Sequence, residues 1–120
     1  MRKKILIAED NEFNQKLIKL ALKEHDIDFA CNGNQAIELF KHNCYDLILM
    51  DLQMPIMNGI EATIEIRNLE SISPETKKPI PVIAMTADHD VESECKEAGM
   101  TGYLTKPITP QDLIDFINRY

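Results

Sequence analysis

Side chains suited to metal and phosphoryl chemistry follow directly after the short apolar runs of this sequence. These side chains are Glu9, Asp10, Asp51, Thr86 and Lys106. Carboxylates held close together repel one another, so a fold keeps such a cluster only if a cation is meant to lie among them. Oxygen ligands without His or Cys select a hard cation such as Mg²⁺. If the ends of these runs meet in the fold, the residue types predict a Mg²⁺ site.

A lysine and a threonine hydroxyl beside such a cation make the site suited to a phosphoryl group. Lys106 can neutralise phosphoryl oxygens, and Thr86, which precedes Ala87, can donate a hydrogen bond to one of them. The sequence offers no Ser-His or Cys-His couple in this arrangement, so a carboxylate is the expected nucleophile. Asp51 follows the central apolar run, and we therefore expect it to form an aspartyl phosphate.

Apolar runs alternate with amphipathic segments along the whole chain. The runs predict strands at Ile5–Ala8, Leu47–Met50 and Pro81–Met85, and weaker ones at Ile27–Ala30 and Tyr103–Thr105. Segments with helical period lie at about 11–24, 35–41, 59–68 and 91–98, and a last helix begins with the cap Thr109 and Pro110. This alternation predicts an α/β fold with a five-stranded, doubly wound parallel sheet. In such a sheet the site lies at the carboxyl ends of the strands.

The first helical segment carries an apolar stripe made of four residues, Phe13, Leu17, Leu20 and Ala21. Their spacing of i, i+4, i+7 and i+8 predicts that this stripe faces the core. Ile18 and Leu22 would then point away from it.

Length and charge limit the classes of protein that fit. A chain of 120 residues predicts one domain. Twenty acidic against 13 basic residues give a net charge of −7, which argues against direct binding to nucleic acid or to an anionic membrane. No apolar run approaches the roughly 20 residues of a membrane span, and the apolar part of the N-terminal segment is too short for a secretory signal. We therefore expect a cytoplasmic protein.

Four motifs, ILIAEDN, MDLQMPIMNG, MTAD and YLTKPI, together resemble the receiver domain of two-component response regulators. The resemblance covers residues 1–120 as a single receiver domain. The sequences of the motifs are most similar to those of receivers in hybrid sensor kinases and phosphorelays. It implies a flavodoxin-like strand order of 2-1-3-4-5. It also implies a signalling phospho-acceptor, rather than a conventional enzyme, that catalyses its own phosphotransfer and autodephosphorylation.

The resemblance also implies roles for individual residues. Asp51 corresponds to the phospho-acceptor, while Glu9, Asp10 and the backbone carbonyl of Gln53 correspond to further ligands of Mg²⁺, with Mn²⁺ as a substitute. The residues that correspond to the phosphoryl-binding and switch positions are Thr86, Ala87, Lys106 and Tyr103, and the Lys106–Pro107 bond is expected to be cis. Glu9 stands where Asp is frequent in the family, which leaves the ligand geometry there open.

The resemblance implies a histidine kinase or a histidine phosphotransfer protein as the phosphoryl donor. Its docking surface is expected at Asn11, Asn14, Gln15 and Ile18, beside the acidic pocket. Phosphorylation is expected to switch the face formed by the fourth strand, the fourth helix and the fifth strand. The output partner, and whether the domain stands alone or belongs to a longer kinase or regulator, stay open.

Three other classes of protein fit the sequence less well. A flavin-binding protein of the same topology needs a loop rich in hydroxyl groups and glycine after the first strand, where this chain has Glu-Asp-Asn-Glu. A phosphatase with an aspartyl nucleophile carries a second acid two residues further on, where this chain has Gln53. A receiver that binds partners without phosphorylation usually lacks one site residue, whereas here the set is intact.

Overall fold

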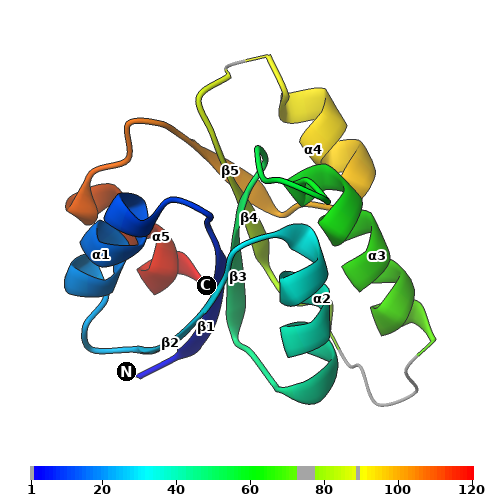
Figure 1. The fold of residues 1–120 in the computed structure, drawn as a ribbon, viewed down its shortest axis with the longest axis horizontal. Helices are drawn as coiled ribbons and strands as arrows, with labels where there is room; N and C mark the ends of the chain where they lie inside the picture. Colours follow the sequence, from blue (N-terminus) through cyan, green and yellow to red (C-terminus); the bar gives the residue numbers. More distant parts are fainter. Residues whose placement is uncertain (1, 73–77, 89) are drawn as a thin grey trace.

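Five strands and five helices alternate along the chain in the computed structural model, which describes residues 2–72, 78–88 and 90–120 (Figure 1). The strands are β1 (Lys4–Ala8), β2 (Asp26–Ala30), β3 (Leu47–Asp51), β4 (Val82–Thr86) and β5 (Gly102–Thr105). The helices are α1 (Glu12–Ala21), α2 (Gly33–His42), α3 (Gly59–Ser71), α4 (Glu92–Ala98) and α5 (Pro110–Arg119). Each strand agrees with its predicted apolar run to within one residue at either end.

The strands form one parallel sheet in the order β2-β1-β3-β4-β5. This order confirms the predicted doubly wound, flavodoxin-like topology. β3 occupies the centre, and all five of its residues are buried. The edge strand β2 is more exposed, which accounts for its weaker signal in the sequence.

Helices cover both faces of the sheet, with α1 and α5 on one face and α2, α3 and α4 on the other (Figure 1). Successive residues of each strand contribute to opposite cores, as the pleat of a strand requires. In β3, for example, Leu47 and Leu49 pack under α1 and α5, whereas Ile48 and Met50 pack under the other three helices. This two-sided burial is the reason that β3 is a continuous apolar run.

The ends of two helices differ from prediction, while the start of α5 agrees with it. The Thr109 side chain accepts a hydrogen bond from the backbone N–H of Asp112, and Pro110 occupies the first turn. α1 ends at Ala21 rather than near residue 24, and α3 continues to Ser71. Among the helices in the described parts of the chain, none is both long and apolar enough to cross a bilayer.

The prediction for the buried face of α1 was wrong. Three residues of the expected core stripe are exposed, with exposed fractions of 67% for Phe13, 48% for Leu17 and 71% for Leu20. The helix instead buries Ile18 against the sheet, and Leu22 follows it in the same core. Both sets of residues have helical spacing, so periodicity alone could not decide which face packs on the sheet.

Candidate functional site

The side chains singled out from the sequence meet at the carboxyl edge of the sheet. Asp51 is the last residue of β3, and Thr86 is the last residue of β4. Glu9 follows β1, and Lys106 follows β5. Because the strands are parallel and in register, these four positions lie side by side across the sheet edge.

Three carboxylates converge at this edge. One oxygen each of Glu9, Asp10 and Asp51 lies within 4.8 Å of the others. Glu9 and Asp51 are buried, with 2% and 3% of their surface exposed, whereas Asp10 is exposed. An all-oxygen donor set of this kind, two buried and one open to solvent, fits a hard cation that keeps some of its water.

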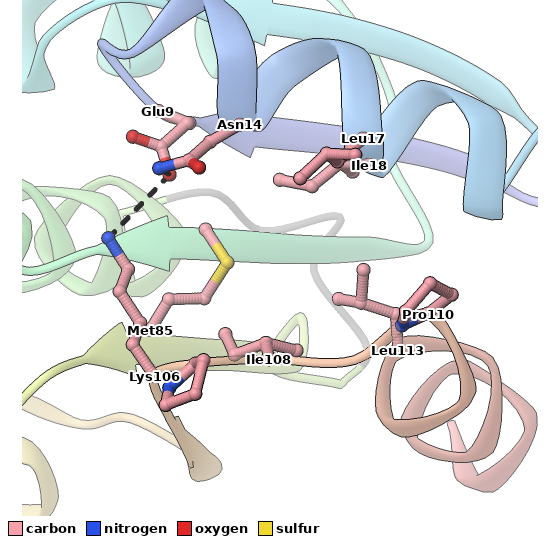
Figure 2. A pocket seen from close by; sticks show the side chains of 10 residues that line it. Glu9, Asn14, Leu17, Ile18, Met85, Lys106, Ile108, Pro110 and Leu113 are labelled. Atoms are coloured by element: carbon pink, nitrogen blue, oxygen red, sulfur yellow. Dashed lines mark hydrogen bonds and ion pairs between the residues drawn. The ribbon is translucent and has the colours of Figure 1, made fainter.

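Lys106 supplies the positive charge of the cluster. Its ammonium group donates a hydrogen bond of 3.0 Å to Asp51 Oδ2 and lies 3.7 Å from Glu9 Oε1. Figure 2 shows this ammonium group facing the Glu9 carboxylate across the edge of the sheet. Burial lowers the pKa of Lys106, but the hydrogen bond and charge of Asp51, together with the charge of Glu9, outweigh burial and raise the pKa overall.

The pKa of the Glu9 carboxyl group is strongly raised by its surroundings. Burial first, and then the negative charge of Asp51, raise its pKa to about 7, against the opposing effect of Lys106. The single lysine therefore does not balance the charge of the two buried carboxylates. A further cation among these groups would favour the ionised form of Glu9.

Backbone groups fix the orientation of the Asp51 and Thr86 side chains. The N–H of Gln53 donates a hydrogen bond of 3.0 Å to Asp51 Oδ1, and the N–H of Asp88 donates one of the same length to Thr86 Oγ1. The N–H of Lys106 donates to the carbonyl oxygen of Thr86 at 2.6 Å. The lysine and the threonine are thus tied together through the backbone.

Of the remaining predicted positions, Ala87 and Pro107 directly follow residues of this cluster, whereas Tyr103 lies at a separate cavity. Ala87 is exposed just after β4. Tyr103 is half-buried in β5 and lines a cavity together with Glu92 and Cys95 of α4. The Lys106–Pro107 peptide bond is cis.

Gly59, at the start of α3, packs directly beneath the phosphoryl-acceptor candidate. A Cβ at this position would clash with the carbonyl oxygen of Asp51 and lie 2.9 Å from Cγ of Met50. Asn58 precedes it and caps α3 reciprocally with Glu61. The Asn-Gly pair of the motif therefore lets α3 begin immediately against the end of β3.

A groove of about 220 Å³ runs from the acidic cluster between α1 and α5 (Figure 2). Glu9, Asn14 and Lys106 lie at its polar end, and the rest of its lining is mainly apolar, from Leu17 and Ile18 to Ile108 and Leu113. Of the expected docking residues, Asn11 is exposed, Asn14 and Gln15 are half-buried, and Ile18 is buried at the base of the groove.

Two features of the site are not predicted from the sequence. The apolar stripe on α1 has the spacing of one helix face, but its large residues are exposed rather than buried in the core. The Asn14 side chain donates a hydrogen bond of 3.3 Å to Glu9 Oε1. No sequence signal beyond the position of Asn14 near Glu9 indicated this contact.

Comparison with known proteins assigns the family. The family model for the response regulator receiver domain matches residues 5–118 of this chain. The chain belongs to the response regulator receiver family. The receiver is also 44% identical, over 96% of its length, to hybrid signal transduction histidine kinase I of Dictyostelium discoideum, of which it spans 7%. This similarity agrees with the resemblance to hybrid-kinase receivers seen in the sequence.

Two solved structures extend the comparison. The receiver domain of the sensor histidine kinase PA1611 from Pseudomonas aeruginosa, with magnesium coordinated in its active site cleft, superimposes with a TM-score of 0.86 at 33% identity. The match covers 100% of this receiver and 98% of that chain. A co-crystal structure of the phosphotransfer protein Ypd1 with the Ssk1 receiver domain from Saccharomyces cerevisiae matches with a TM-score of 0.91 at 30% identity, covering 99% and 88%. The receiver is thus a domain of the kind used in two-component and phosphorelay signalling.

Proposed function

We propose that residues 1–120 act as one receiver domain in which Asp51 accepts a phosphoryl group from a phosphohistidine of a partner protein. The observation that carries the proposal is the environment of Asp51. Its carboxylate lies at the end of the central strand, 3.0 Å from the Lys106 ammonium and beside the oxygens of Glu9 and Asp10. This arrangement places a candidate carboxylate nucleophile, a fixed ammonium group and two further carboxylates within one pocket.

The acidic cluster fits Mg²⁺, with Mn²⁺ as a substitute. Glu9, Asp10 and Asp51 would hold the ion through carboxylate oxygens, and the backbone carbonyl of Gln53 would add a further ligand. The donor set supports this assignment because it consists of hard oxygens that leave an excess of negative charge. When bound, the ion neutralises charge on the carboxylate and on the phosphoryl oxygens.

In the proposed reaction, an Asp51 oxygen forms a bond to phosphorus while the P–N bond of the phosphohistidine breaks. The electron pair of that bond returns to the imidazole nitrogen of the donor. Lys106 holds the Asp51 carboxylate in place beforehand and then pairs with a phosphoryl oxygen. In hydrolysis, a water oxygen forms a bond to the same phosphorus while the bond between phosphorus and the Asp51 oxygen breaks, which releases inorganic phosphate and returns Asp51 to its free carboxylate.

The phosphoryl group adds about −1.5 to −2 charges and several acceptor oxygens to the pocket. Thr86 donates its hydroxyl hydrogen to one of these oxygens, and the N–H of Ala87 lies at the same loop. The movement of Thr86 opens space for Tyr103, and the equilibrium between conformations of the β4-α4-β5 face shifts. The output partner recognises the conformation of this face.

The donor protein docks on α1 next to the pocket. Phe13, Leu17 and Leu20 form an exposed apolar surface there, and a contiguous exposed apolar patch commonly marks a site of interaction with another protein. Asn11, Asn14 and Gln15 lie between this surface and the acidic cluster, and Ile18 supports it from below. A histidine kinase or a histidine phosphotransfer protein would bring its phosphohistidine over this surface to Asp51.

Replacement of the acceptor tests the proposal. Asp51→Asn removes the nucleophile and keeps the shape of the side chain, so incubation with acetyl phosphate and Mg²⁺ should add a phosphoryl group to the wild-type chain only. Asp115→Asn, on the exposed face of α5, is the matched control and should be labelled like the wild type. Intact-mass measurement gives the result. Mg²⁺-dependent labelling of Asp51→Asn at the wild-type rate would exclude Asp51 as the acceptor.

A further inference from the structure

Glu9 is held in the pocket by the first turn of α1. Its backbone carbonyl accepts a hydrogen bond from the Gln15 amide, and its Oε2 accepts one of 3.3 Å from the N–H of Asn11. Its Oε1 accepts one of 3.3 Å from the Asn14 amide. The short segment from Asn11 to Gln15 thus contacts both the backbone carbonyl and the carboxylate of Glu9.

Asn14 differs from Lys106, which also lies close to the Glu9 carboxylate. Lys106 divides its charge between Glu9 and Asp51 and is 0.7 Å closer to Asp51, at 3.0 Å against 3.7 Å. In the part of the chain that the structure describes, the Asn14 amide donates to Glu9 alone. The Asn14 amide is therefore not shared between Glu9 and a second acceptor, whereas the Lys106 ammonium is.

The backbone of Asn14 is itself fixed. Its N–H donates a hydrogen bond of 3.0 Å to Oδ1 of Asn11, the N-cap of α1. The side chain is half-buried at the polar end of the groove, next to Glu9 (Figure 2). An amide held at its backbone and partly enclosed has few other orientations, so it can direct the carboxylate that it contacts.

We propose that Asn14 is a positioning residue that holds the Glu9 carboxylate in the geometry needed for cation binding, and that Glu9 and Asn14 act as a pair. This inference rests on the proposed function of the acidic cluster as a Mg²⁺ site. Glutamate has one more rotatable bond than aspartate, so its carboxylate needs more restraint to stay at one position. Asn14 provides that restraint, in the way that partners of metal ligands commonly orient them.

The length of the side chain makes the pair testable. Glu9→Asp draws the carboxylate back by one carbon–carbon bond, about 1.5 Å, which removes it from hydrogen-bonding reach of the Asn14 amide. Loss of the amide should then matter only in the chain that carries Glu9. A role of Asn14 in the stability of α1 alone would have the same effect in both backgrounds.

Calorimetric titration of the metal-free full chain with Mg²⁺, at mildly alkaline pH, measures the effect. We expect Asn14→Ala to weaken Mg²⁺ binding about tenfold in the wild-type background, at the low end of the 10–100-fold range for such partners. In the Glu9→Asp background, the same substitution should change the affinity by less than about twofold. Asn118→Ala, at an exposed position of α5, controls for the higher helix propensity of alanine and should bind like the wild type.

A second readout needs no metal. In urea with a chelator, Asn14→Ala should lower the unfolding midpoint relative to Asn118→Ala in the Glu9 chain, and should not do so in the Glu9→Asp chain. Equal shifts in the two backgrounds, or Mg²⁺ affinity of Asn14→Ala within twofold of the wild type, would overturn the pairing and leave the proposed function standing. A wild-type chain that binds no Mg²⁺ would overturn both.

Discussion

The ammonium group of Lys106 donates a hydrogen bond of 3.0 Å to Oδ2 of Asp51, and the two residues are separated by 55 positions in the chain. The contact joins the loop after β5 to the central strand and places a positive charge beside the Asp51 carboxylate. It also leaves the second oxygen of Asp51 to the backbone N–H of Gln53. The two carboxylate oxygens of Asp51 therefore have separate, fixed partners.

Removal of this lysine should separate cation binding from switching. Lys106→Ala takes away a positive charge that competes with Mg²⁺ for Glu9 and Asp51, so Mg²⁺ affinity should be kept or should increase. The phosphorylated variant lacks the contact that draws β5 toward the site, so amide shifts on the β4-α4-β5 face should stay at their unphosphorylated values. Lys41→Ala, an exposed position on α2, is the control. Wild-type shifts in phosphorylated Lys106→Ala would contradict the role given to the lysine.

The raised pKa of Glu9 predicts a pH dependence of folding without metal. Its value of about 7 in the folded chain lies above the ordinary 4.5, so the folded state binds the proton more tightly than the unfolded state. The contribution of Glu9 to stability is then complete below about pH 4.5 and is lost as the pH rises through about 7. Glu9→Gln has no such group, so it should gain stability relative to the wild type between pH 5 and 8, on the order of 1–3 kcal/mol.

Urea unfolding of both chains in the presence of a chelator measures this difference. Asp115→Asn removes an exposed carboxyl on α5 and should follow the wild-type curve. A constant difference between Glu9→Gln and the wild type from pH 5 to pH 8 would show that Glu9 has an ordinary pKa.

The exposed surface of α1 should serve recognition rather than stability. Phe13→Ser and Leu20→Ser replace side chains that are 67% and 71% exposed, so each should change the free energy of unfolding by no more than about 0.5 kcal/mol. Phosphotransfer from a phosphohistidine partner should slow at least tenfold, while labelling by acetyl phosphate stays unchanged. Unchanged transfer from the partner in both variants would place its docking surface elsewhere.

Leu22→Ala gives the opposite pattern on the same segment of chain. Leu22 is 1% exposed and packs in the core beneath α1 and α5, so its truncation should cost about 2–5 kcal/mol. Urea unfolding and the phosphotransfer rate should be measured for Leu22→Ala and for the two serine variants. The two measurements together distinguish the buried side of this segment from its exposed side.

Ile56 stores backbone strain in the loop between β3 and α3. Its φ of 70° lies in the left-handed region that disfavours a β-branched residue, and its side chain is 80% exposed. Ile56→Gly loses little burial and removes the strain, so it should stabilise the domain by about 1 kcal/mol in urea unfolding. Gly99→Ala, at φ 98° beside the Arg67 side chain, should destabilise it. Destabilisation by Ile56→Gly would mean that the Ile56 side chain contributes more than its exposure indicates.

Most of the fold could be predicted from the sequence because its signals are local. A strand buried on both faces, such as β3, must be continuously apolar. The cap formed by Thr109 and Asp112 can be predicted because the two residues are only three positions apart in the sequence. The convergence of Glu9, Asp51 and Lys106 followed from one topological rule for parallel sheets. Each of these inferences needed only the order of elements along the chain.

Other features depend on packing that the sequence does not record. α1 carries two apolar stripes, and only its rotation on the sheet decides that Ile18 is buried and Leu17 is half exposed. The Asn14–Glu9 contact and the φ of Ile56 are settled by side-chain and loop geometry at the finished site. Periodicity indicates that a face is apolar, but it does not indicate which neighbour covers that face.

The groups around the acidic pocket come from the ends of four different strands, with Glu9 after β1, Asp51 on β3, Thr86 on β4 and Lys106 after β5. Strand pairing across the whole of that sheet region is needed before they meet. During synthesis on the ribosome, a chain that has not yet emerged beyond Lys106 has a carboxylate at position 51 but no assembled pocket around it. Competence to be phosphorylated should therefore arise only after synthesis has passed Lys106 and the sheet has formed, and incomplete or misfolded copies should not accept a phosphoryl group from the donor.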